Sequence, residues 1–266
     1  MTRIRLDQLL VERDLARSRS EATSLLLAGE VELGGGGGRT LKPGQLVPSD
    51  AVITVRARPR WASRAGAKLE AALEAFQIDV TDRACLDAGA STGGFTDVLL
   101  ARGARIVYAV DVGRAQLLER LRTDPRVVSM ERTNLRELAG LPEPIDLATL
   151  DLSFISLARV LSRVHQLLIE HGRVIALVKP QFEAGRGSVP RGGVVRDPAT
   201  HRAVLLRFAA DAAAAGFRPA GLIESPLTGA DGNREFLAVL VHRSASDEAA
   251  GEPWVTLVER LTPSPV

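Results

Sequence analysis

The sequence has one cysteine, few aromatic residues and no long apolar run. The single cysteine, Cys85, excludes an intramolecular disulfide and a cysteine-rich metal site. No apolar run approaches the roughly 20 residues that cross a bilayer. Charged residues also interrupt the apolar ones at the N-terminus, unlike in a signal peptide. These absences predict a cytoplasmic protein, and its 266 residues, 45% of them hydrophobic, can bury a substantial core.

Lysine is also scarce. Only Lys42, Lys68 and Lys179 are found among the 34 basic residues, and all the others are arginine. Arginine stays protonated near neutral pH, whereas a partly buried lysine amine can lose its proton. Each remaining lysine is therefore a candidate for a role that arginine cannot fill, with chance retention as the alternative.

Positive charge is concentrated at the start of the chain. Residues 1–60 hold ten basic and seven acidic side chains, whereas the two kinds nearly balance in the rest. This asymmetry favours a polyanionic partner. The segment predicts short helices and strands, with the glycine run Gly34–Gly38 as a flexible turn because no helix pattern follows it. We expect a small domain over residues 1–58, a linker over 59–63, a larger domain over 64–243 and a C-terminal tail over 244–266.

Strand-like and helical stretches alternate from about Ser63 onward. This alternation predicts an α/β fold with a Rossmann-like, doubly wound parallel sheet. Ligands of such sheets bind beyond the carboxyl ends of the strands. Polar residues end five of the predicted strands, and we expect them to share one edge: Asp87, Asp111, Asn134, Asp151 and Lys179.

A glycine-rich turn, Cys85–Thr96, connects the first of these strands to a helix. Its glycines allow a ligand to approach the backbone N–H groups at the helix start. Ser91 stands where a dinucleotide-binding turn needs its second glycine, and Asp87 would repel a diphosphate but attract a cationic group. Asp111 can bind ribose hydroxyls. The pattern favours S-adenosylmethionine over NAD, and an ordinary capped turn is the alternative.

Two of the three lysines lie among the charged residues that the pattern brings together. Lys179 follows the apolar run Val174–Val178, and Asp151 ends the fourth strand. Lys68 lies on the helix before the first strand, and Glu235 precedes the last strand. A lysine at the end of a buried strand can give up its proton and act as a base. A structural network of ion pairs is the alternative.

These two lysines and two acids, beside an Asp-x-Gly-x-x-x-Gly-Gly-Phe turn, resemble the ribose 2'-O-methyltransferases of the FtsJ/RrmJ fold. The resemblance implies S-adenosylmethionine as cofactor and Lys68, Asp151, Lys179 and Glu235 as the catalytic set. Lys179 would be the base, and Lys68 would stabilise the developing alkoxide. The implied cofactor-binding residues are Asp87, Ala88, Gly89, Ser91, Thr92, Gly93, Gly94, Phe95, Asp111, Val112 and, against adenine, Asn134.

The N-terminal segment resembles the small RNA-binding domain of the ribosomal protein S-four type. The matching features are the segment Arg5–Leu10, the basic turn Ala16–Ala22, the segment Gly29–Val31 and the turn Lys42–Gly44. In that family, paired helices present arginines to RNA phosphates. The alternative for this chain is that its arginines lie on a helical face that contacts only solvent. The arginines that the resemblance implies are Arg3, Arg5, Arg13, Arg17 and Arg19.

Such a domain, joined by a Trp-containing linker to a body of this type, is similar to the TlyA family, often labelled haemolysin. That family methylates cytidine ribose in ribosomal RNA, so the resemblance implies ribosomal RNA or ribosomal subunits as partner, without membrane or metal. A non-catalytic ribosome-assembly factor and a membrane-active haemolysin are the alternatives. Pseudouridine synthases also carry this kind of N-terminal domain, but such an enzyme would have no use for the glycine-rich turn.

The loop Pro180–Pro198 is rich in Gly and Arg and directly follows Lys179. It either clamps RNA over the site or is an ordinary surface loop.

Overall fold

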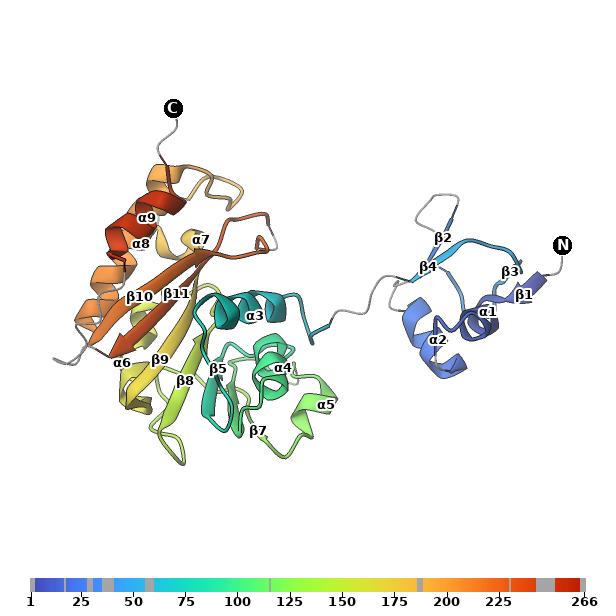
Figure 1. Cartoon of the computed structure of the whole chain (residues 1–266), viewed down its shortest axis with the longest axis horizontal. Coiled ribbons are helices and arrows are strands. Elements are labelled where there is room, and N and C mark those ends of the chain that lie inside the picture. The colour runs from blue at the N-terminus through green and yellow to red at the C-terminus, as the bar shows by residue number, and fades with distance from the viewer. Residues whose placement is uncertain are drawn as a thin grey trace. The chain divides into compact units, whose positions relative to one another are not determined.

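The computed structural model divides the chain into two compact units, Met1–Arg60 and Trp61–Val266 (Figure 1). The residues that it describes are 3–16, 18–27, 31–34, 41–55, 60–114, 116–185, 189–229, 231–242 and 252–263. Apart from Gly34, the predicted glycine turn lies outside the described residues, as does Arg17. No helix of the described part of the chain is long and apolar enough to cross a membrane.

The smaller unit packs two short helices beside two strand pairs. Its elements are β1 (Arg3–Arg5), α1 (Leu6–Glu12), α2 (Arg19–Leu27), β2 (Val31–Leu33), β3 (Leu46–Pro48) and β4 (Ile53–Val55). Strand β1 pairs antiparallel with β3, and β2 pairs antiparallel with β4. Leucines at helical spacing, such as Leu6 and Leu10, bury one face of α1 against Leu25 and Leu26 of α2.

A seven-stranded sheet forms the centre of the larger unit. In chain order its strands are β5 (Ala84–Ala88), β6 (Ile106–Val110), β7 (Val127–Met130), β8 (Ile145–Leu150), β9 (Leu168–Val178), β10 (Phe217–Glu224) and β11 (Phe236–His242). The spatial order is β10-β11-β9-β8-β5-β6-β7. The strands from β9 to β7 in this order run parallel, whereas β11 runs antiparallel to both of its neighbours. The predicted α/β class is confirmed, but the sheet is mixed and not wholly parallel.

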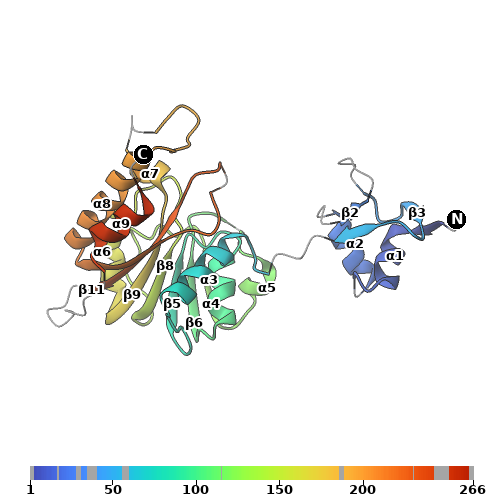
Figure 2. The same cartoon turned by 45° about the horizontal axis from the view of Figure 1, so that its top comes forward.

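Helices cover both faces of this sheet (Figure 2). They are α3 (Ala65–Ala75), α4 (Gly94–Ala101), α5 (Glu119–Arg122), α6 (Ala158–Leu167), α7 (Pro180–Glu183), α8 (Pro198–Ala214) and α9 (Trp254–Leu261). One core contains residues of α6, α8 and α9, and the other contains residues of α3 and α4. Strand β9 contributes Ala176 to the first core and Leu177 to the second, which explains why its sequence is apolar without alternation.

Both ends of the larger unit differ from the predicted boundaries. Trp61, expected in the linker, is buried in the core beside α3 and α4, and the Ala62 N–H donates to Asp97 at 2.7 Å. The predicted separate tail contains α9, in which Val258 is fully buried. The Trp254 Nε1–H donates to the Leu205 carbonyl of α8 at 3.1 Å. The apolar stripe of α9 covers β10 and α8, so this helix belongs to the larger unit.

Candidate active site

The topology of the sheet brings most of the predicted site residues to one edge. Parallel strands that are neighbours in a sheet end at the same edge, where ligands bind in open α/β folds. Asp87 is the penultimate residue of β5. Three other predicted residues directly follow strands β6, β8 and β9: Asp111, Asp151 and Lys179.

Glu235 reaches this edge for a different reason. Strand β11 is antiparallel to β9, and its first residue, Phe236, lies opposite Val178, the last residue of β9. Glu235 directly precedes β11 and Lys179 directly follows β9, so the two side chains start from neighbouring backbone positions. The N-terminal end of the antiparallel strand β11 therefore adds an acid to the edge at which the parallel strands have their carboxyl ends.

The four predicted catalytic residues form two ion pairs. Lys179 Nζ lies 2.7 Å from Asp151 Oδ1 and donates to Ser153 Oγ at 3.0 Å. Lys68 Nζ, on α3, lies 2.5 Å from Glu235 Oε2. These five residues help to line one cavity of about 340 Å³, which we call the rim cavity. Two amines, each oriented by a carboxylate, can there move a proton and stabilise negative charge.

An exposed aromatic side chain borders the rim cavity. Phe154, three residues after Asp151, is 90% exposed and has a left-handed φ of 64°. Its ring packs at 5.1 Å, between centroids, against Phe182, which also lines the cavity. A large apolar side chain in a strained, exposed position suggests a binding role. Phe154 was not among the predicted site residues, although a phenylalanine directly after the Asp-Leu-Ser segment was a visible signal.

Asn233 connects the rim cavity to the loop that follows α7. This buried side chain accepts a hydrogen bond from the Val195 N–H and donates to the Gly193 carbonyl, both at 2.9 Å. Its own backbone carbonyl accepts from the N–H of Gly229, which lines the cavity near Glu235. Asn233 was not among the predicted site residues, because no local sequence pattern marks a contact between residues 40 positions apart. Residues 186–188 of the Gly- and Arg-rich loop lie outside the described residues.

Asp87 does not face the open side of the glycine-rich turn. Its carboxylate is fully buried and accepts from the Thr96 N–H at 2.8 Å and the Thr96 Oγ1–H at 2.6 Å. Burial raises the pKa of this carboxyl to about 7, although the bonds from Thr96 act in the opposite direction. The direct ligand contact expected from the sequence is therefore corrected: Asp87 fastens the turn to the start of α4.

The open part of the turn lies beside Asp111. Asp111 Oδ2 accepts from the Ser91 N–H at 2.8 Å, and its Oδ1 accepts from the Gly113 N–H at 2.6 Å. Val112 is 74% exposed next to it. Gly89 has a φ of 86°, and a Cβ there would lie 2.4 Å from the Asp151 carbonyl oxygen, so only glycine fits. A carboxylate beside an exposed apolar side chain and a glycine-containing turn fits a nucleoside with a ribose diol.

The remaining residues of the predicted cofactor set differ in exposure, and one of them lies away from the strand ends. Asn134 does not end a strand, because β7 ends at Met130, and its side chain donates to Glu137 Oε1 at 2.6 Å. Ser91 is exposed and Thr92 half-buried. The buried members of the set are Ala88, Gly93, Gly94 and Phe95. Phe95 packs in the core beside α3 and α4, so it supports the turn from behind.

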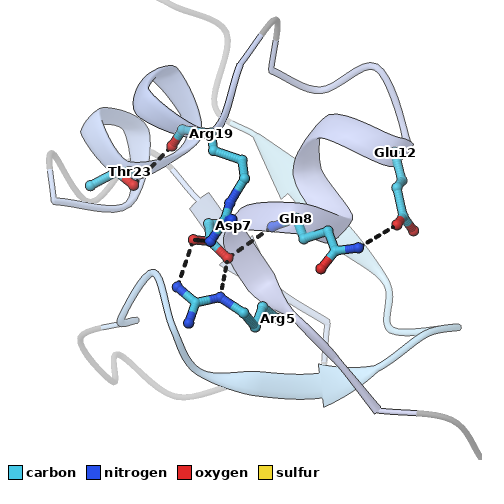
Figure 3. Close-up of polar contacts among 6 residues, drawn as sticks. All are labelled: Arg5, Asp7, Gln8, Glu12, Arg19 and Thr23. Carbon is cyan, nitrogen blue, oxygen red and sulfur yellow. Dashed lines mark hydrogen bonds and ion pairs between the residues drawn. The ribbon is translucent and has the colours of Figure 1, made fainter.

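The predicted RNA-binding arginines of the smaller unit lie in different environments, and Figure 3 shows two of them, Arg5 and Arg19, beside Asp7. Arg5 and Arg19 both bind the carboxylate of Asp7. Arg13 instead donates to the backbone carbonyls of the turn after β3, and Arg3 makes one long contact, 3.5 Å, with a carbonyl of β3. The structure therefore brings only two of the described arginines together.

Comparison with known proteins agrees with this geometry. The chain matches the family described as FtsJ-like methyltransferase over residues 61–241. It is 49% identical over 240 residues to Bacillus subtilis YqxC, named as an rRNA methyltransferase, covering 88% of this chain and 84% of the relative. It is 47% identical over 253 residues to Mycobacterium tuberculosis TlyA, named 16S/23S rRNA (cytidine-2'-O)-methyltransferase, covering 93% and 92%. A solved Streptococcus thermophilus structure, described as a hemolysin, gives a TM-score of 0.72 at 39% identity, covering 98% and 96%.

Proposed function

The chain belongs to the FtsJ-like methyltransferase family, and we propose that it methylates the ribose 2'-hydroxyl of cytidine in ribosomal RNA. The methyltransferase activity and the use of S-adenosylmethionine, both predicted from the sequence, are confirmed by this family membership. The observation that carries the RNA proposal is the pairing of two lysines with two carboxylates in the rim cavity. Two relatives are named as rRNA methyltransferases, which supports the same substrate.

The cofactor supplies an electrophilic methyl group bound to a positively charged sulfur. Asp111 is proposed to accept hydrogen bonds from the ribose hydroxyls of the cofactor, because its carboxylate lies at the open part of the turn. The exposed side chain of Val112 would pack against the adenine ring. Asp87 would act indirectly, by holding the turn on α4 through Thr96.

Lys179 is proposed to be the base. A ribose hydroxyl is a poor nucleophile until a base removes or shares its proton. Lys179 Nζ is held by Asp151 and Ser153 in the rim cavity, which gives it a defined position. In its neutral form the amine would accept the proton of the 2'-hydroxyl. The oxygen could then take the methyl group that the cofactor would supply, and the sulfur that gives up this group would become neutral.

Lys68 is proposed to stabilise the oxygen during the same step. Its ammonium is held by Glu235 within the same cavity, so the charge is already oriented before substrate binds. A preorganised cation favours an oxygen that becomes more negative, and it needs no rearrangement to do so. Phe154 would stack on the target base, because its exposed ring lines the same cavity as the two lysines.

Methyl transfer from radiolabelled S-adenosylmethionine to isolated 16S and 23S rRNA and to ribosomal subunits tests this function. We expect label in 2'-O-methylcytidine after digestion to nucleosides, and none with Lys179→Ala. The variant should still bind the cofactor, which calorimetry can verify. Label in a methylated base, or no label with any of these RNAs, would contradict the proposal.

A further inference from the structure

Asp7 is a buried acid in the smaller unit that the proposed reaction does not use. Its Oδ1 accepts from Arg5 Nε at 3.0 Å and from the Gln8 N–H at 2.9 Å (Figure 3). Its Oδ2 accepts from one terminal nitrogen of Arg5 and one of Arg19, both at 2.9 Å. The bonds from Arg5, followed by those from Arg19, hold the pKa of this carboxyl well below its usual range, although burial opposes the shift. Asp7 is therefore ionised at neutral pH.

The two arginines that share Asp7 are both accessible. Their side chains remain 46% and 59% exposed. Two guanidinium groups on one carboxylate oxygen would repel each other without it, so Asp7 makes their proximity possible. In the described part of the chain, the second terminal nitrogen of each guanidinium has no hydrogen-bond partner. These nitrogens can donate to an anion.

The neighbouring turn leaves the guanidinium of Arg5 uncovered. A Cβ on Gly44 would lie 3.4 Å from both terminal nitrogens of Arg5, so a longer side chain at this position would cover the guanidinium. The Pro43 carbonyl of the same turn accepts from the Asp7 N–H at 3.0 Å, which fixes the turn beside the carboxylate. Arg13 is different, because both of its terminal nitrogens already donate to the carbonyls of Ser49 and Ala51.

We propose that Asp7 is a positioning residue that holds Arg5 and Arg19 together as one phosphate-binding site for RNA. The identity of the anion rests on the proposed function, since an RNA substrate supplies phosphates. Phosphate prefers paired, preorganised guanidinium groups, which bind it with several charge-assisted hydrogen bonds. The net charge of the three groups is positive, so the site attracts a phosphate despite its central acid.

The charge of Asp7 allows a test that separates positioning of the arginines from an effect of overall charge. The two explanations predict opposite changes in RNA affinity when this charge is removed. Asp7→Asn removes one negative charge and would leave RNA binding equal or tighter if only overall charge mattered. If Asp7 positions the arginines, the same change weakens binding of the full chain to 23S rRNA by about tenfold and lowers the salt slope by about 1. Glu12→Gln is the matched control, because Glu12 is an exposed acid of the same helix whose side chain, among the described residues, bonds only Gln8.

A double-variant comparison separates positioning from loss of the fold. Arg19→Ala should weaken RNA binding by about tenfold in the natural background, but by less than about threefold when Asp7→Asn is already present. Thermal unfolding and cofactor binding are measured for each variant. If Asp7→Asn does not fold, Arg5→Ala and Arg19→Ala replace it: one shared site predicts that the double variant binds little more weakly than either single variant.

Three outcomes would overturn the proposal: equal or tighter binding by a folded Asp7→Asn, an equal loss with Glu12→Gln, or full additivity of the two arginine variants. The proposed function is tested separately by methyl transfer with the natural chain. Weaker RNA binding of Asp7→Asn without any ribose methylation by the natural chain would retain the positioning role and reject the function. Ribose methylation by the natural chain, together with unchanged RNA binding by Asp7→Asn, would support the proposed function and reject the positioning role of Asp7.

Discussion

Lys179 lies 2.7 Å from Asp151 in the rim cavity, in a chain that has only three lysines among its 34 basic residues. If Lys179 is the base, Lys179→Arg keeps the charge but should lower single-turnover methyl transfer by about 10²- to 10⁴-fold. The reason is that a guanidinium does not release its proton near neutral pH. Cofactor binding, measured by calorimetry, should change little.

Lys42→Arg is the matched control for this prediction, because Lys42 is an exposed lysine of the smaller unit. It should retain the single-turnover rate of the natural chain. Turnover near the natural rate with Lys179→Arg would mean that Lys179 is not the base and that its ion pair with Asp151 is structural.

Asp87 makes the stability of the larger unit depend on pH. Its pKa is raised by burial to about 7 in the folded chain, above the unfolded value of about 4. Between these values the folded chain holds the proton more tightly than the unfolded chain, so its contribution to stability falls as pH rises toward 7. Asp87→Asn keeps an acceptor for Thr96 and removes this decline. The stability of the variant relative to the natural chain should therefore increase from pH 5 to pH 8.

Urea unfolding at several pH values, followed by tryptophan fluorescence, measures this difference. Both tryptophans of the chain, Trp61 and Trp254, are in the larger unit, so the signal reports that unit alone. The difference should grow by at most about 1.4 kcal/mol per pH unit, the value for one proton. Parallel stability profiles for the two proteins would contradict a raised pKa at Asp87.

Helix α9 contributes to the core through one of its faces. Leu257 and Val258 are buried in the core with α6 and α8, whereas Val255 of the same helix is 48% exposed. Leu257→Ala should lower the free energy of unfolding of the larger unit by about 2–4 kcal/mol, because it leaves a cavity in packed surroundings. Val255→Ala should change it by less than about 0.5 kcal/mol. Equal effects of the two substitutions in urea unfolding would mean that α9 is not docked.

The two units of the whole molecule are expected to divide binding and chemistry. Residues 1–60 hold the positive excess of the chain and the Arg5–Asp7–Arg19 cluster. A chain beginning at Arg60 should bind S-adenosylmethionine like the full chain, but bind ribosomal RNA at least tenfold more weakly and with a shallower salt dependence. Calorimetry measures the first affinity, and filter binding over a range of salt measures the second. Unchanged RNA affinity and salt slope would assign RNA binding to the larger unit.

Several features could be predicted because they depend on local patterns. Alternating strands and helices identify the fold class, and parallel strands must end at a common edge. Asp111, Asp151 and Lys179 were therefore found from their positions at predicted strand ends. Asn134 was misplaced by the same reasoning, because β7 ends four residues earlier than the sequence suggested.

Other features depend on contacts between distant parts of the chain. Lys68 and Glu235 are 167 residues apart, and they meet because β11 runs against β9. The depth at which Asp87 is buried, and the sharing of Asp7 by Arg5 and Arg19, likewise follow from packing. Residue type and spacing decide which groups are present and which strand edge they reach, because backbone periodicity is local. Which groups touch, which face solvent and which only support others is decided by the tertiary structure, because burial and pairing require elements remote in sequence to come together.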